Sequence, residues 1–345
     1  MPLLFAKTTS PITRRYYRRL SGPWLLMVMA LVLVGCEGQQ SALDPAGHGA
    51  ERIAELFWWL VGGAVIVWVI VVGLAVYALR VNPGPHPERQ TRLLIIGGGA
   101  LFPTLVLAGY LIYGLSMMPD LLAPAPKGSL EITVSGEQWW WRVQYHTPEG
   151  DRVALANEIH LPVGEPVQFH LESPDVAHSF WIPALGGKMD MLPGRTNHLT
   201  LHPTRTGVFT GACAEYCGEA HTLMRFYAVV QEKEDFDAWL EQQSNPVASP
   251  ATPLTQRGEE VFSAHGCGAC HAVRGTEADG VIGPDLTHVG SRLSLGAGTL
   301  PNETSDFLRW ITHTETVKPG VHMPAFGMLP EADLHALAAY LDGLE

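Results

Sequence analysis

Positive charge is scarce in this sequence. Its 345 residues include 22 Lys and Arg against 34 Asp and Glu, which gives a net charge of −12 at pH 7. Proteins that hold nucleic acid by its phosphates need a basic surface, so this charge argues against such a role. Hydrophobic residues make up 47% of the chain, too many for a disordered protein. The length suits two or three domains of roughly 100–200 residues each.

Cysteine is scarce as well. The chain has five, namely Cys36, Cys213, Cys217, Cys267 and Cys270. An odd number argues against a simple disulfide framework in an exported protein. If Cys36 carries a lipid, two pairs remain, and each pair has a histidine close by in the sequence. The cysteines therefore favour bound cofactors over disulfide bonds.

The N-terminus has the pattern of an export sequence. Residues 1–35 combine five basic residues with a short apolar run over 24–34, which is typical of a signal peptide. The segment ends in Leu33-Val34-Gly35-Cys36, which resembles the lipobox of bacterial lipoproteins. That resemblance implies that Cys36 becomes the lipid-bearing mature N-terminus. An uncleaved signal anchor with a chance cysteine is the alternative.

Two further apolar runs, over residues 53–79 and 93–115, are each long enough to cross a bilayer as a helix. The loop between them contains Arg80, Arg89 and Arg92, and the positive-inside rule places it in the cytoplasm. Residues 36–128 therefore predict a transmembrane helical hairpin in a bacterial inner membrane. The N-terminus and everything after the second helix are expected outside the cytoplasm.

The rest of the chain contains two segments with different sequence patterns, joined by a linker. Residues 129–243 contain short alternating apolar segments separated by turn sequences, which predict a β-sandwich or barrel closed by a helix over 234–243. A Ser-, Pro- and Ala-rich linker follows over 244–255, and residues 256–345 predict helices. We expect a multidomain protein with a two-helix transmembrane hairpin, an all-β domain and an all-α domain.

The all-α segment contains the sequence CGACH at 267–271, which is the attachment motif of a c-type haem. Cys267 and Cys270 would bind the haem covalently, and His271 would bind its iron from one side. Met323 is the candidate for the second axial ligand, with Met328 and His322 as alternatives. A thioredoxin-type disulfide or half of a zinc site would each need a sequence context that is lacking here. Residues 256–345 resemble class I cytochromes c.

The β segment contains a second cluster, in which Cys213, Cys217, His221 and Met224 fall within twelve positions. Thiolate, imidazole and thioether ligands together favour copper over harder metals. Two thiolates can bridge two copper ions, and each ion then needs its own imidazole. His178, in DVAHSFWIP, is the candidate for the second imidazole. A disulfide, and a copper-delivery protein with a thioredoxin fold, are the alternatives.

These motifs, with GEQWWWRVQY at 136–145 and KMDMLPGRTN at 188–197, resemble subunit II of haem–copper oxidases. That resemblance implies a cupredoxin-like domain with a dinuclear CuA centre. It implies that the Glu215 carbonyl binds copper and that the Glu215 carboxylate reaches Mg or Mn at the boundary with subunit I. It also implies that Trp139 admits electrons. Many members have an acidic residue near the second helix, and here only Glu88, in the loop, could serve that proton path.

The resemblance implies subunit II of an aa-type cytochrome c oxidase that carries its own C-terminal cytochrome c. A soluble donor such as cytochrome c would reduce the haem, which would reduce CuA and then subunit I, where O2 becomes water with proton pumping. Subunits I and III and membrane lipid are the other expected partners. A flexible linker would make the transfer from haem to CuA intramolecular. A CuA-containing subunit of a nitric oxide reductase and a free-standing membrane-anchored carrier are the alternatives.

Overall fold

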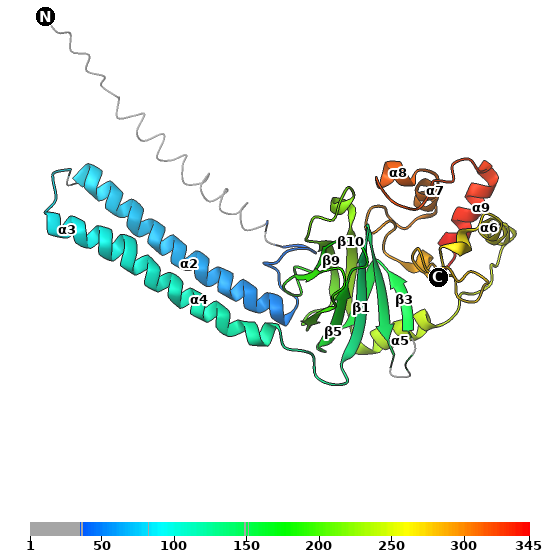
Figure 1. The fold of residues 1–345 in the computed structure, drawn as a ribbon, viewed down its shortest axis with the longest axis horizontal. Coiled ribbons are helices and arrows are strands. Elements are labelled where there is room, and N and C mark those ends of the chain that lie inside the picture. Colours follow the sequence, from blue (N-terminus) through cyan, green and yellow to red (C-terminus); the bar gives the residue numbers. More distant parts are fainter. Residues whose placement is uncertain (1–34, 36, 82, 148–149, 151) are drawn as a thin grey trace, which may run out of the picture.

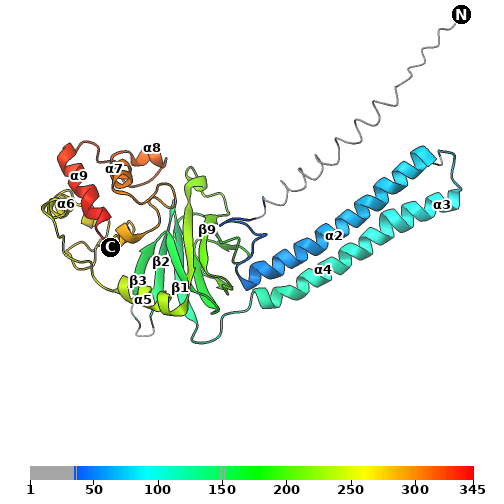
Figure 2. The same cartoon turned by 180° about the vertical axis from the view of Figure 1, so that it is seen from behind.

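The computed structural model describes residues 35, 37–81, 83–147, 150 and 152–345. The predicted signal peptide and Cys36 lie outside these residues. The described chain has three parts in a row: a helical hairpin, a β-domain and a helical domain (Figures 1 and 2). The predicted fold class is confirmed.

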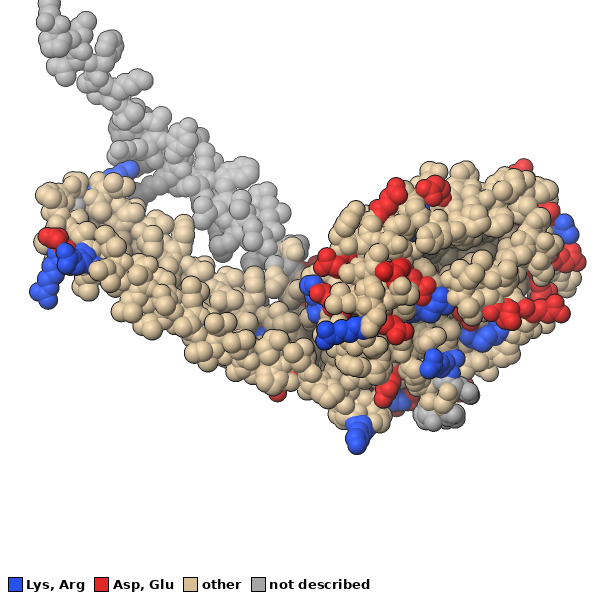
Figure 3. Space-filling model, viewed as in Figure 1, with Lys and Arg blue, Asp and Glu red and all other residues tan. Residues whose placement is uncertain are grey.

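The hairpin consists of two long helices. The first comprises α2 (His48–Val76) and η2 (Tyr77–Val81), and the second comprises α3 (Glu88–Leu93), η3 (Leu94–Leu101) and α4 (Phe102–Leu121). Both are long and apolar enough to cross a membrane, and none of their most apolar window is buried in the chain itself. Figure 3 shows this apolar surface, with charged side chains gathered at the loop end and over the other domains. Both helices extend beyond the predicted apolar runs.

The first helix extends further because the β-domain holds its start. The Ala46 N–H donates to Ala184 O at 2.7 Å, and the His48 N–H donates to His202 O at 2.9 Å. Between them, a side chain at Gly47 would place its Cβ 2.4 Å from Leu185 O, so only glycine lets the chain pass this closely. The hairpin is therefore fastened to the β-domain by backbone contacts.

The β-domain is a sandwich of two five-stranded sheets with the strand orders β3-β2-β1-β5-β8 and β4-β10-β9-β6-β7. The strands are β1 (Leu130–Glu137), β2 (Trp140–His146), β3 (Arg152–Ala156), β4 (Glu158–Pro162), β5 (Val167–Glu172), β6 (His178–Trp181), β7 (Met189–Met191), β8 (Asn197–Leu201), β9 (Gly207–Cys213) and β10 (Arg225–Gln231). Aromatic rings fill the space between the sheets, with Trp141, Phe180 and Phe226 in mutual contact. The Tyr145 hydroxyl joins the sheets, because it donates to His160 O and accepts from the His160 N–H.

The helical domain is built around two crossing helices, α6 (Pro253–Ala264) and α9 (Glu331–Asp342). They approach closely at Gly258, where an added Cβ would lie 2.1 Å from Ala336 O. The other elements of this domain are η5 (Cys267–Ala269), η6 (Val289–Ser291), α7 (Thr304–Thr312) and α8 (Thr314–Val317). Two further helices belong to the β-domain, η4 (His221–Leu223) between β9 and β10 and α5 (Lys233–Ser244) after β10.

The predicted linker has contacts of its own. The Val247 N–H donates to Arg274 O at 3.0 Å, and Asn245 O lies 3.0 Å from His288 Nε2. At its other end, Thr252 and Thr255 form a capping box at the start of α6. These contacts hold both ends of the linker against the helical domain.

Candidate metal and haem centres

The predicted copper ligands meet at one end of the second sheet. Residues 213–224, here called the copper loop because they contain most of the candidate ligands, connect β9 to β10. Strand β6 lies beside β9, with Phe180 opposite Cys213. His178 begins β6, so this pairing carries its ring to the copper loop across 35 residues of sequence. The imidazole and the two cysteine sulfurs lie within 4.8 Å of one another, and all three residues are buried.

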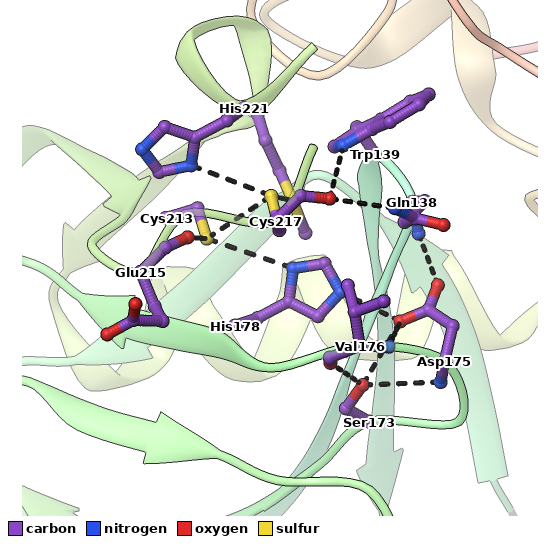
Figure 4. A network of polar contacts seen from close by, with 11 residues as sticks. Gln138, Trp139, Ser173, Asp175, Val176, His178, Cys213, Glu215, Cys217 and His221 are labelled. Atoms are coloured by element: carbon purple, nitrogen blue, oxygen red, sulfur yellow. Dashed lines mark hydrogen bonds and ion pairs between the residues drawn. The ribbon is translucent and has the colours of Figure 1, made fainter. Parts of the chain in front are cut away.

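The two sulfurs are neighbours with one imidazole at each end (Figure 4). Cys213 Sγ and Cys217 Sγ lie 3.8 Å apart, well beyond the roughly 2.05 Å of a disulfide bond. His178 Nδ1 lies 3.8 Å from Cys213 Sγ, and His221 Nδ1 lies 3.5 Å from Cys217 Sγ. Each sulfur therefore has one imidazole nitrogen close to it, so the two thiols and the two imidazoles could bind metal together.

Two softer or weaker donors complete the set. Met224 Sδ lies 3.8 Å from Cys217 Sγ, and Glu215 O lies 3.1 Å from Cys213 Sγ. The Glu215 carboxylate points away from the sulfurs, and its residue is exposed (Figure 4). Two thiols, two imidazoles, a thioether and a carbonyl fit copper, because a thioether is a poor ligand for harder metals.

The thiol pair favours holding a single negative charge when no metal is bound. Hydrogen bonding from Cys217 is the main cause that lowers the pKa of Cys213, despite burial. The same contact raises the pKa of Cys217, because a second thiolate beside the first is unfavourable. A bound cation reverses this penalty, since it lets both sulfurs ionise as ligands.

Asp175 and Gln138 contact the candidate ligands His178 and Cys217, and the sequence motifs alone did not assign a role to either residue. Asp175 Oδ1 lies 2.9 Å from His178 Nε2, so the carboxylate holds the ring nitrogen that faces away from the sulfurs. Although burial lowers the pKa of His178, its contacts with Cys213 and Asp175 raise it above the usual value. Gln138 donates from Nε2 to Cys217 O at 2.7 Å and from its backbone N–H to Asp175 Oδ2 at 2.7 Å. Metal-binding histidines commonly have such outer partners.

The helical domain contains a cavity of about 560 Å³. Cys267, Cys270 and His271 line one side of it, and both cysteines are free thiols. His271 Nδ1 lies 2.8 Å from Pro284 O, which leaves Nε2 for a metal ion. Gly283 allows this ring to lie close, because an added Cβ would be 2.5 Å from it. The walls are largely apolar, so the cavity suits a haem.

The candidates for the second axial ligand lie in different places. Met323 and His322 line the cavity, whereas Met328 is 76% exposed and is not among the lining residues. Only Met323 combines a thioether with a position on the cavity wall.

The β-domain supplies part of the cavity wall, through Trp139 among other residues. Trp139 is 7% exposed, and its indole N–H donates to Cys217 O at 3.0 Å. Its ring lies between Gly218 of the copper loop and Gly320 of the helical domain, where added Cβ atoms would approach it to 2.9 and 2.7 Å. Trp139 therefore lies between the candidate haem cavity and Cys217, a candidate copper ligand. Trp140 instead stacks on Arg142, and Trp141 is fully buried in the sandwich.

Glu88 lies far from both centres, at the loop end of the hairpin. It is exposed and forms an ion pair with Arg92 at 3.0 Å, one helical turn away.

Comparisons with known proteins agree with this geometry. Residues 149–232 match the family described as cytochrome c oxidase subunit II, periplasmic domain, and residues 255–345 match the cytochrome c family. The chain is 36% identical to cytochrome c oxidase subunit 2 of Alkalihalophilus pseudofirmus, over 93% of this chain and 96% of the relative. The chain belongs to the cytochrome c oxidase subunit 2 family.

Two further relatives are less similar or match a shorter part of the chain. The subunit from Bacillus subtilis is 28% identical over 93% of this chain and 96% of its own length. A crystal structure of the periplasmic domain of subunit II from Bradyrhizobium japonicum is 31% identical, covers 35% of this chain and 96% of that one, and gives a TM-score of 0.33. As a member of this family, the chain is part of an oxidoreductase, and it carries its own cytochrome c domain. Its families imply copper and haem c.

Proposed function

We propose that this chain is the electron-entry subunit of an aa-type cytochrome c oxidase. In this role a soluble donor such as cytochrome c reduces its haem c, and electrons then pass through a dinuclear CuA centre to subunit I, where O2 is reduced to water with proton pumping. The placement of one imidazole at each end of a pair of neighbouring thiols carries the proposal. Two thiolates can bridge two copper ions, and this arrangement supplies one imidazole for each ion.

The copper ligands in this proposal are the residues of the loop and of β6. Cys213 and Cys217 bridge the two ions, and His178 and His221 each cap one. Met224 is a weak ligand, and Glu215 contributes its carbonyl. Two bridging thiolates held by a rigid sandwich need little movement on changing charge, which suits a relay.

The haem residues in this proposal line one cavity. Cys267 and Cys270 bind the haem covalently, and His271 and Met323 bind its iron. Trp139 links the two centres, supported by its hydrogen bond to Cys217 O and its place in the cavity wall. Its role is then internal transfer as much as entry from a separate donor.

The remaining roles concern the membrane and the partner subunits. The N-terminus and both globular domains lie outside the cytoplasm, the arginine-rich loop lies inside it, and Cys36 carries a lipid. The exposed Glu215 carboxylate binds Mg or Mn against subunit I, and Glu88 serves proton entry. Subunits I and III and membrane lipid are the other partners. The domain boundaries are 36–128, 129–243, 244–255 and 256–345.

Spectroscopy of the copper-loaded, purified chain tests the central claim. We expect a c-type haem band in the visible range, together with the near-infrared and EPR signatures of a mixed-valence dicopper centre. A haem band without the dicopper signature at full copper loading would contradict the proposal.

The axial ligand has a matched pair of variants. Met323→Leu should lower the haem midpoint potential, because a thioether ligand raises it. Met328→Leu should leave the potential and the visible spectrum unchanged, since its side chain is exposed. The reverse result would move the ligand to Met328.

A further inference from the structure

Lys318 is a charged side chain buried at the boundary between the two globular domains. It follows α8 in the helical domain and is only 2% exposed. Its ammonium donates to Trp139 O at 2.7 Å, to Leu223 O at 2.8 Å and to Gly296 O at 2.8 Å. The first two acceptors belong to the β-domain and the third to its own domain, so this side chain reaches across the boundary.

The three contacts match the chemistry of the group. A lysine ammonium has three N–H donors, and here three carbonyl oxygens accept from it. Burial disfavours the charged form and lowers the pKa of Lys318 to about 7, so a complete set of acceptors is needed for the ammonium to lie there. Because the same ammonium is hydrated when the domains separate, the contacts give little net attraction. The contacts instead make the docking specific, since all three form together only in one relative placement of the domains.

The docked arrangement of the two domains brings Lys318 and its neighbours against residues next to the copper loop. Trp139 is held at two points, by Lys318 at its carbonyl and by Cys217 O at its indole N–H. Leu223 directly precedes the candidate ligand Met224. Gly320, two residues after Lys318, allows the helical domain to approach the Trp139 ring. The segment around Lys318 therefore contacts the copper domain next to the proposed route between the centres.

We propose that Lys318 fixes the register in which the cytochrome domain docks on the copper domain, and thereby the placement of the haem cavity against Trp139. It is a positioning residue, and the inference rests on the proposed function of the two centres. Two further bonds across the boundary mark the same docked state, from the Arg225 N–H to Ala297 O at 3.1 Å and from the Leu293 N–H to Glu158 Oε2 at 2.7 Å.

The test compares Lys318→Met with Lys233→Met in the full chain carrying both cofactors. Both changes replace a lysine with a methionine, but Lys233 is half-exposed on α5, where it contacts Asp237 and the Phe236 ring of its own helix. Lys318→Met would take the ammonium donor away from the carbonyls of Trp139 and Leu223, whereas Gly296 O would keep its hydrogen bond from the Thr299 hydroxyl, so docking in the native register becomes unfavourable. We expect the rate of electron transfer from haem to copper, followed after rapid photoreduction of the haem, to fall about tenfold or more. Lys233→Met should match the unmodified chain.

Hydrogen exchange gives a readout that needs no electron transfer. The amides of Arg225 and Leu293 should exchange faster in Lys318→Met and at the normal rate in Lys233→Met. The haem and copper spectra and midpoint potentials should stay the same in both variants. Unchanged transfer and exchange in Lys318→Met would overturn the proposal, and so would altered spectra, which would mean that Lys318 supports a ligand instead.

The two proposals fail in different ways. If the unmodified chain shows no dicopper signature, the proposed function fails. The exchange measurement on that same chain still decides whether Lys318 fixes the docking.

Discussion

The imidazole of His178 is already oriented toward the sulfurs of the candidate metal site by its hydrogen bond to Asp175. His178 directs Nδ1 toward Cys213 Sγ, while Asp175 holds Nε2. The carboxylate thereby selects which nitrogen faces the sulfurs and limits rotation of the ring. Hydrogen bonds from the Val176 N–H and His178 lower the pKa of Asp175, although burial opposes them, so the carboxylate stays charged.

Asp175→Asn should weaken copper binding by about 10–100-fold, the usual effect of losing an outer partner of a metal ligand. The fold should persist, since asparagine keeps the size and one oxygen acceptor. Competition against a copper chelator measures the affinity. Glu172→Gln, which removes an exposed carboxylate nearby on β5, is the control and should bind copper normally. Equal affinities for the two variants would contradict the role of Asp175.

Sequence patterns predicted most of the candidate ligands because the spacing of these residues is local. Cys213, Cys217, His221 and Met224 lie within twelve positions, and the haem motif within five. Lys318 could not be assigned in this way, because its role depends on which distant segments the fold brings together. Lys318 lies 179 residues from one acceptor and 95 from another, and no local pattern records such contacts.

At the scale of elements, periodicity predicted the hairpin, the strands and the helical domain, since each buries or exposes a regular face. It did not predict how closely elements approach. Glycines mark those places, as Gly47 does at the start of α2 and Gly258 does between α6 and α9. A glycine within a helical segment has two interpretations in a sequence. It is either a residue of low helix propensity or a place where another element packs closely against the helix.

Gly258→Ala should destabilise the cytochrome domain by about 1–3 kcal/mol, because the added methyl group meets the Ala336 carbonyl and overpacks the crossing. Denaturant unfolding followed by the haem absorbance measures the change. Ser263→Ala, at an exposed position of α6, is the control and should change stability little. A stabilised Gly258→Ala variant would show that helix propensity outweighs packing at this crossing.

The whole molecule combines two kinds of contact with different responses to salt. The net charge of −12 and the acidic side chains over the globular domains favour encounter with a basic soluble donor (Figure 3). The boundary between the domains is instead held largely by bonds to backbone carbonyls and by a buried lysine.

Raising ionic strength should therefore slow electron delivery from a basic donor cytochrome and leave the transfer from haem to copper nearly unchanged. Stopped-flow reduction measures the first step, and photoreduction of the haem measures the second. A small uncharged reductant is the control for the first step, because its rate should not depend on salt. An internal step that slows in parallel with delivery would indicate electrostatic docking of the domains.

The three parts of the chain lie along one axis, with the apolar hairpin at one end, the sandwich in the middle and the cytochrome domain at the other end (Figure 1). Backbone bonds at residues 46–50 fix the sandwich to the hairpin, so the sandwich cannot swing freely above the bilayer. The cytochrome domain is consequently the part of the described chain farthest from the hairpin, with the sandwich between them (Figure 1). This spatial order agrees with the proposed order of reduction, and a docked cytochrome domain would pass electrons to the sandwich without having to dissociate from it.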